Sequence, residues 1–160
     1  MRRYFKPAVT ALVVLLLLSP ISRAKGSQKC EGDILITIER GACFGSCPIY
    51  SAQIYADGTV VYVGKNYVKT IGEQRFKISQ DRIQNLIKEF ERIDYWSLKD
   101  KYETDENGMS VTDLPTTTTS ICLDGKKKRV VNYYHAPRKL DELEDKIDSL
   151  AGLYSLIGPL

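Results

Sequence analysis

Two hairpins stand out in the alternation of apolar and polar residues along the chain. Residues 49–64, IYSAQIYADGTVVYVG, hold two runs rich in β-branched and aromatic residues on either side of Asp57-Gly58. This dipeptide suits the positive φ angles of a tight primed turn. Residues 116–135, TTTTSICLDGKKKRVVNYYH, repeat the pattern around a second Asp-Gly pair. Further strands are expected over residues 34–40 and 73–79, which are rich in strand-forming residues.

Two other stretches space their apolar residues three and four positions apart, as one face of an amphipathic helix does. The first follows Ser79, a residue suited to cap a helix, and its apolar positions are Ile83, Leu86, Ile87, Phe90 and Ile93. The second follows Pro137, and its apolar positions are Leu140, Leu143, Ile147, Leu150 and Tyr154. Residues 99–115 between them are expected to form a polar, acidic loop. This order predicts an α+β domain, an antiparallel sheet of about five to six strands built from hairpins, with two amphipathic helices packed on one face.

The first 24 residues follow the pattern of a secretory signal peptide. A basic start, an apolar run over residues 8–18 and small residues before position 25 are its three parts. The run is shorter than the about 20 apolar residues that a spanning helix needs, which disfavours the alternative of an uncleaved anchor. The sequence therefore predicts a signal peptide over residues 1–24, a flexible segment over 25–33 and a single domain over 34–158. We expect an exported protein, periplasmic or secreted, with no stable membrane span after cleavage.

Signal cleavage would change the charge balance of the chain. The sequence has 23 Lys and Arg against 20 Asp and Glu, and four of the basic residues lie in the first 24 positions. The remainder is nearly neutral, so the basic excess gives no indication of a nucleic-acid partner. One basic run, Lys126 to Arg129, remains. It either contacts an anionic partner or guards a strand edge against mispairing.

Four cysteines follow the predicted cleavage site, and an even number in an exported chain favours disulfides. Cys43 and Cys47 enclose Phe-Gly-Ser, and we expect them to form a local disulfide whose ring needs the backbone freedom of Gly45. A bond between Cys30 and Cys122 would be the second disulfide. Four cysteines allow three pairings, and the other two stay open at this point.

Thiol-redox chemistry is the alternative interpretation of Cys43 and Cys47. A redox pair usually encloses two residues and lies at a helix N-terminus, which lowers the pKa of the first thiol. Here three residues separate the cysteines, and Pro48 and a predicted strand follow. Zinc is disfavoured because His135 is the sole histidine and a second cysteine pair is absent from the sequence. We expect no metal and no cofactor.

The acidic residues also fail to make a recognisable catalytic or metal motif. Glu103, Asp105 and Asn107 match the start of an EF-hand loop, but the position of the closing glutamate is occupied by Leu114. The acids of the last predicted helix are interpreted as a solvated face, and they are Asp141, Glu142, Glu144 and Asp145. With one histidine and none of the common catalytic motifs, the sequence predicts no catalytic residue and favours binding over catalysis.

The stretch CFGSCPIY, followed by an Asp-Gly hairpin and a glycine that closes the next strand, resembles a family of bacterial exported domains of unknown function. The matching positions are Cys43, Phe44, Gly45, Cys47, Pro48, Tyr50, Asp57, Gly58 and Gly64. The resemblance extends over roughly residues 34–150 and includes the second hairpin and the last helix. It implies a single exported α+β domain and brings no catalytic residue, and Cys30 and Cys122 lie outside the motif.

These patterns together favour a small exported, disulfide-stabilised domain with a binding or structural role in the cell envelope or outside the cell. The partner is unknown. The expected binding surface is the disulfide loop with the adjacent hairpin, namely Phe44, Gly45, Tyr50, Asp57 and Gly58. An aromatic side chain on a constrained loop loses little entropy when it makes a contact. The alternative is that Phe44 plugs the end of the sheet.

Overall fold

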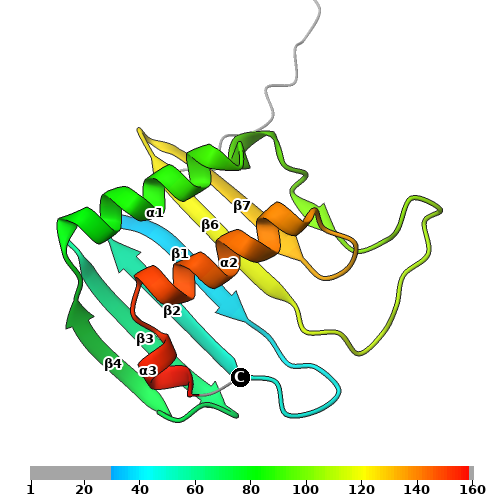
Figure 1. The fold of residues 1–160 in the computed structure, drawn as a ribbon, viewed down its shortest axis with the longest axis horizontal. Coiled ribbons are helices and arrows are strands. Elements are labelled where there is room, and N and C mark those ends of the chain that lie inside the picture. Colours follow the sequence, from blue (N-terminus) through cyan, green and yellow to red (C-terminus); the bar gives the residue numbers. More distant parts are fainter. Residues whose placement is uncertain (1–29, 159–160) are drawn as a thin grey trace, which may run out of the picture.

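The computed structural model describes residues 30–158, in which one mixed seven-stranded sheet packs against helices (Figure 1). The strands are β1 (Ile34–Arg40), β2 (Ile49–Tyr55), β3 (Thr59–Asn66), β4 (Gly72–Lys77), β5 (Lys101–Tyr102), β6 (Thr117–Leu123) and β7 (Lys126–Asn132). The helices are α1 (Gln80–Arg92), the 3₁₀ helix η1 (Tyr95–Ser97), α2 (Arg138–Leu150) and α3 (Tyr154–Ile157). The strand order across the sheet is β4-β3-β2-β1-β6-β7-β5.

The α+β class is confirmed, and three short elements, β5, η1 and α3, add to those predicted. The two-residue strand β5 lies within the expected polar loop and pairs in parallel with β7, whereas all other neighbouring strands are antiparallel. The sheet thus has seven strands instead of five to six. Helix α2, which corresponds to the second predicted helix, ends at Leu150. Gly152, with φ +76°, then precedes the short helix α3. Tyr154 therefore begins α3 and is exposed instead of extending the apolar face of α2.

The N-terminal predictions fall mostly outside the described residues. This holds for the signal peptide expected over residues 1–24 and for the first part of the flexible segment expected over 25–33. Cys30, where the description begins, is bonded to Cys122 of β6, and a turn at residues 32–33 leads into β1. No helix within residues 30–158 has the length and apolar character needed to cross a bilayer.

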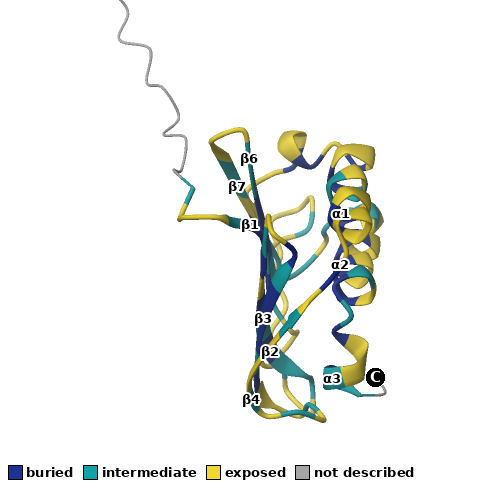
Figure 2. Cartoon of the chain, turned by 90° about the vertical axis from the view of Figure 1, so that its left-hand side faces the viewer, coloured by how far each residue is buried: buried dark blue, intermediate teal, exposed yellow. Residues whose placement is uncertain are grey.

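The helices cover one face of the sheet and leave the other face bare (Figure 2). The covered face carries alternate residues of the central strands, which are buried: Ile36, Ile38, Tyr50, Ala52, Ile54, Val60 and Tyr62. The helices add the apolar stripes expected from their sequence spacing: Ile83, Leu86 and Phe90 from α1, and Leu140, Leu143 and Ile147 from α2. Each fully buried side chain of this size stabilises the fold by roughly 1.5 to 3 kcal/mol. The Ser79 hydroxyl caps α1 by accepting from the Arg82 N–H, as the sequence predicts.

The connections between strands divide between the two ends of the sheet. At one end lie the β1–β2 connection, the β3–β4 connection and the segment that enters β6 (Figure 1). The Asp57-Gly58 and Asp124-Gly125 turns lie at the other end, because β1 pairs antiparallel with both β2 and β6. This division decides which of the predicted residues can form one surface.

Candidate binding site

The loop between β1 and β2 is closed by a disulfide between Cys43 and Cys47, whose Cα atoms are 5.8 Å apart. Gly45 adopts φ +145° inside this ring, a value that L-residues with a side chain rarely reach, and its N–H donates to the Cys43 carbonyl. A second disulfide joins Cys30 to Cys122, with 5.7 Å between the Cα atoms. The expectation that this domain contains disulfide bonds is confirmed.

Phe44 lies at the tip of the disulfide ring and is 88% exposed. Its backbone N–H donates to the Asp113 carbonyl at 3.1 Å, and the Gly41 N–H donates to the Thr116 carbonyl at 2.8 Å. The disulfide loop is thus hydrogen-bonded to the segment that enters β6. Because so little of its side chain is covered, Phe44 does not plug the end of the sheet.

That second segment also exposes apolar side chains. Leu114 follows Asp113 directly, and Val111 and Met109 lie further along the same loop, all three exposed. The Tyr133 hydroxyl donates to the Val111 carbonyl at 2.9 Å and so holds the middle of this loop. We refer to residues 41–48 and 103–116 together as the paired loops. The Phe44–Asp113 hydrogen bond brings the chain at Leu114 next to the disulfide loop, and neighbouring exposed apolar residues, rather than single ones, are typical of an interaction surface.

Arg40 and Tyr50 anchor the two ends of the disulfide loop to α2. The Tyr50 hydroxyl donates to Oδ1 of Asp148 at 2.5 Å, and Arg40 donates to Oδ2 of the same carboxylate through Nη2 at 2.7 Å and Nε at 3.1 Å. The Arg40 Nε–H also contacts the Tyr50 hydroxyl at 3.0 Å. Asp148 is only 1% exposed, so this carboxylate is buried and paired. The strands that enter and leave the loop therefore share one fixed point on a helix.

Burial determines the ionisation of this cluster. It raises the pKa of the Tyr50 phenol well above its usual value, so the hydroxyl keeps its proton and donates it. Burial also raises the pKa of Asp148, while the charge of Arg40 and the hydrogen bonds from Tyr50 and Arg40 act in the opposite direction. Burial alone would lower the pKa of Arg40. The nearby Asp148 carboxylate and its hydrogen bond outweigh this effect and raise the pKa above its usual value, so the guanidinium stays charged.

Tyr50 was expected on the binding surface, and the structure corrects this placement. The side chain is fully buried on the covered face of β2, in line with Ala52 and Ile54. Strand alternation in residues 49–55 puts these three residues on one face. This alternation in the sequence indicates that the Tyr50 side chain is buried. Tyr50 thus supports the loop from beneath and is not available for contact with a partner.

A second buried acid, Glu144, lies one helical turn before Asp148. The residue is 3% exposed, and Asn132 Nδ2 donates to both of its carboxylate oxygens at 3.0 and 3.2 Å. Burial raises the pKa of Glu144 to about 7, and the Asn132 hydrogen bond and the Arg40 charge offset only part of this effect. The prediction that the acids of this helix form a solvated face is therefore wrong for Glu144. It holds for Asp141, Glu142 and Asp145, which are exposed.

An open cleft of about 310 Å³ lies between the paired loops and α2. Leu114 and Tyr133 line one side of it, and Arg40, Glu144 and Asp145 line the other. The polar groups at its base are engaged with one another, since Arg40 also contacts Asp145 at 3.3 Å. These contacts join α2 to the sheet.

Asp57 and Gly58, expected to share a surface with Phe44, lie at the opposite end of β2. The seven residues of this strand separate the two ends by roughly 20 Å. The Asp57 carboxylate is used in its own turn, where it accepts from the Thr59 N–H at 2.8 Å and contacts Lys77 at 3.2 Å. Adjacency along a hairpin misled the prediction, because the disulfide loop and the turn flank opposite ends of one strand.

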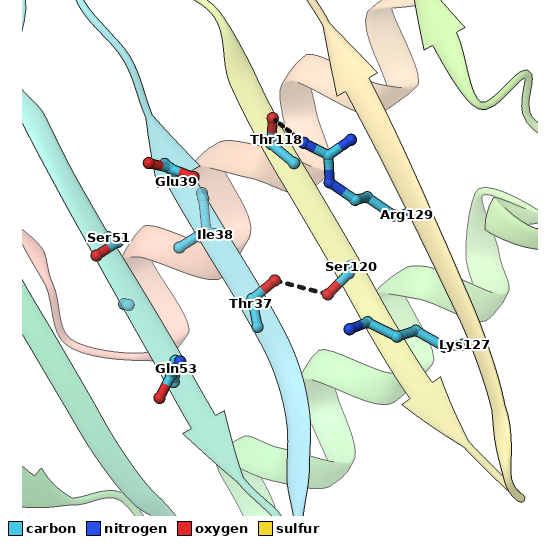
Figure 3. Close-up of a pocket in the computed structure, with 10 residues that line it drawn as sticks. Thr37, Ile38, Glu39, Ser51, Gln53, Thr118, Ser120, Lys127 and Arg129 are labelled. Carbon is cyan, nitrogen blue, oxygen red and sulfur yellow. Dashed lines mark hydrogen bonds between the residues drawn. The ribbon is translucent and has the colours of Figure 1, made fainter. Parts of the chain in front are cut away.

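The bare face of the sheet carries a shallow polar hollow of about 300 Å³ (Figure 3). On its floor the hydroxyls of Thr37 and Ser120 are hydrogen-bonded to each other at 2.6 Å. Lys127 and Arg129 line one side, whereas the intervening Lys128 lies on the other face and donates to the Leu98 carbonyl at 2.7 Å. The basic run Lys126 to Arg129 is thus divided between two faces and forms no single basic patch.

The acidic loop residues hold their own backbone in place. Asp105 Oδ1 accepts from the N–H groups of Asn107 and Met109 at 2.9 and 2.8 Å, which fixes the turn at the tip of the loop. Among residues 30–158, no group of three or more His, Cys, Asp or Glu side chains is placed to hold a metal ion.

A family of known domains matches nearly the whole of the folded part of the chain. The family described as "Domain of unknown function (DUF6438)" matches residues 34–151, from the start of β1 to the residue after α2. No curated protein matches the chain. The matched span contains the paired loops, the Arg40–Tyr50–Asp148 cluster and three of the four cysteines.

Proposed function

The chain belongs to the DUF6438 family of domains of unknown function, and we propose that it is an exported domain that binds a partner in the cell envelope or outside the cell through its paired loops. The observation that carries this proposal is the exposure of Phe44, 88%, at the tip of a covalently closed ring. Aromatic side chains are among those that contribute most to binding at protein interfaces.

The disulfide loop is organised before any partner arrives. Its ring is closed by Cys43 and Cys47, its tip is hydrogen-bonded to Asp113, and its two ends are anchored through Arg40 and Tyr50 to α2. A contact made by Phe44 therefore orders little additional chain, which reduces the entropic cost of binding. Rigidity of this kind supports a binding role for an exposed aromatic that contributes nothing to the core.

The cysteines support the proposed export. All four are paired in disulfides, and disulfides persist mainly in oxidising compartments such as the periplasm and the extracellular space. A signal peptide over residues 1–24 and a single working domain over 34–158 are part of this proposal. Mass spectrometry of the protein recovered from cells should find an N-terminus at Lys25 and the chain outside the cytoplasm. A chain retained in the cytoplasm with free thiols would refute it.

The binding role is tested by photo-crosslinking from position 44. We would replace Phe44 with a benzophenone-bearing phenylalanine, irradiate living cells and identify the cross-linked products. The matched control places the same residue at Trp96, which is 39% exposed on η1. We expect a specific product from position 44 and not from position 96. Phe44→Ser should retain the unfolding temperature and abolish co-purification of the same partner.

Two results would contradict the proposal. If Phe44→Ser kept the partner, the paired loops would not be its binding site. If quantitative thiol labelling showed that Cys43 and Cys47 cycle readily with a mild reductant, the alternative of a thiol-redox protein would replace binding as the function of this loop.

A further inference from the structure

We propose that β4 is the contact surface of a symmetric dimer, in which the β4 strands of two copies of this chain pair antiparallel. This strand forms one edge of the sheet, and no strand within residues 30–158 pairs with its outer side (Figure 1). An unpaired edge presents a row of backbone donors and acceptors that can pair with another strand. The six residues of β4 make it much longer than β5 at the opposite edge, which has two.

The register of β4 against β3 shows which of its backbone groups face outward. The Ile78 N–H donates to the Gly58 carbonyl at 2.9 Å, next to the opposed pair Thr59 and Lys77. Hydrogen-bonded and non-hydrogen-bonded pairs alternate along an antiparallel ladder. The N–H and C=O groups of Lys77, and by alternation those of Arg75 and Glu73, therefore point away from β3.

The charges on this edge are self-complementary in one register. When the two-fold axis passes at Gln74, Glu73 of each copy lies opposite Arg75 of the other, and each such pair exchanges two backbone hydrogen bonds. The Glu73 and Arg75 side chains are more than half exposed and 3.0 Å apart within one chain, so the dimer would bring them into a square of alternating charge. Opposite charges at facing positions stabilise strand pairs.

The neighbouring symmetric registers all place like charges opposite each other, which is destabilising. An axis at Glu73 faces the two Glu73 side chains, and an axis at Phe76 puts Arg75 opposite Lys77. An axis at Arg75 pairs Glu73 with Lys77 but also faces the two Arg75 side chains. Charged residues usually protect an edge strand from pairing, and the register centred on Gln74 pairs opposite charges without facing like charges.

The covered side of β4 also accommodates this register. Phe76 is half-buried and lines an open groove of about 440 Å³ with Ile78 and Leu156. In the register centred on Gln74, Phe76 lies opposite Gly72 of the second copy. Gly72 has open space where a Cβ would stand, which leaves room for the aromatic ring. Pairing an aromatic with a glycine across two strands is a known way to shield the glycine backbone.

The dimer is tested by sedimentation velocity of the purified, disulfide-bonded protein over a range of concentrations. We expect reversible, concentration-dependent dimerisation, because an interface of one strand is smaller than most stable protein interfaces. Glu73→Arg and Arg75→Glu each place like charges opposite each other and should raise the dissociation constant at least about tenfold. An equimolar mixture of the two variants should recover the dimer, because the two arginines of the Glu73→Arg chain would then face the two glutamates of the Arg75→Glu chain.

The matched control is Arg92→Glu, which reverses a charge and breaks the exposed ion pair with Glu89 on α1, away from β4. It should dimerise as the wild type does. Arg75→Pro removes an outward-facing N–H that takes no part in the β3 ladder, so this variant should fold and stay monomeric. A monomeric wild type, a dimer insensitive to the charge reversals, or a mixture that remains monomeric would each overturn the proposal. The same holds if β4 binds an added extended peptide while the chain stays monomeric.

Discussion

Tyr50 and Asp148 lie 98 positions apart in sequence and are joined by a 2.5 Å hydrogen bond in the interior of the domain. Tyr50 is the second residue of β2, directly after the disulfide loop, and Asp148 is near the end of α2. Arg40, directly before the loop, reaches the same carboxylate. The shape of a loop in the first third of the domain therefore depends on a helix from its last part.

Removing the Arg40 charge should be costly. Arg40→Met would leave Asp148 buried without a counter-ion, and breaking a buried pair in this way typically destabilises by about 3 to 5 kcal/mol. The loss should shrink at acidic pH, where Asp148 can take up a proton. Denaturant unfolding measures it, with Lys65→Met as the control. Lys65 pairs with Glu39 on the surface, so its loss should cost no more than about 0.5 kcal/mol. Equal losses for the two variants would show that the cluster does not hold α2 to the sheet.

Glu144 should make the domain less stable as the pH rises. Its pKa of about 7 in the folded state lies above the ordinary value of 4.5, so the folded chain holds this proton more tightly than the unfolded chain. The resulting stabilisation is complete below about pH 4.5 and is lost as the pH rises through about 7. Glu144→Gln imitates the protonated acid and should be more stable than the wild type by about 2 to 3 kcal/mol at pH 8.

The comparison requires unfolding curves at several pH values for the wild type, Glu144→Gln and the exposed control Glu142→Gln. Only the first substitution should flatten the pH profile, and its advantage should vanish near pH 4. Parallel profiles for all three proteins would mean that Glu144 titrates normally in the folded state.

The hairpins and the two long helices could be predicted because their signals are local. The Asp-Gly pairs at residues 57–58 and 124–125 mark turns, and the spacing of apolar residues marks α1 and α2. The same kind of reasoning could have found Tyr50, which alternates with Ala52 and Ile54. It could also have found Glu144 and Asp148, which follow Leu140 at intervals of four residues and so share its buried face.

What local patterns could not supply is the partner of each buried polar group. The sequence gives no sign that Arg40 meets a carboxylate 108 positions later, because that contact depends on how α2 crosses the sheet. Strand β5 escaped prediction for a related reason. A stretch of two residues is too short to show an alternation of apolar and polar positions. Lys101 and Tyr102 form a strand only because β7 lies beside them.

Gly64 on β3 should tolerate no side chain. A Cβ at this position would fall on the Thr70 carbonyl oxygen, with the Tyr62 hydroxyl and Val68 also too close at 2.9 Å. Gly64→Ala should therefore cost on the order of 3 kcal/mol or more through displacement of the backbone. Gly125→Ala is the matched control. Gly125 has φ +74° and open space around it, so only the backbone conformation is penalised, by about 1 kcal/mol. Thermal unfolding that ranked the two variants in the reverse order would contradict the packing at Thr70.

The two disulfides should contribute very differently to stability. Cys30 and Cys122 are 92 positions apart, whereas Cys43 and Cys47 are four apart. A cross-link restricts the unfolded chain more when it closes a longer loop, so replacing the first pair by serine should cost about 4 to 5 kcal/mol and replacing the second about 2 kcal/mol. The smaller ring should matter instead for binding, because it holds Phe44 in place.

Both double variants can be compared by denaturant unfolding under non-reducing conditions. The fully reduced wild type is measured separately, with reductant present. The Cys30/Cys122 variant should unfold at a clearly lower denaturant concentration than the Cys43/Cys47 variant, and the reduced wild type at the lowest of all. The order should invert for partner binding below the unfolding transition, where the Cys43/Cys47 variant loses more. If the short ring proved the larger stabiliser, the loop would have to be part of the core, which its exposed Phe44 contradicts.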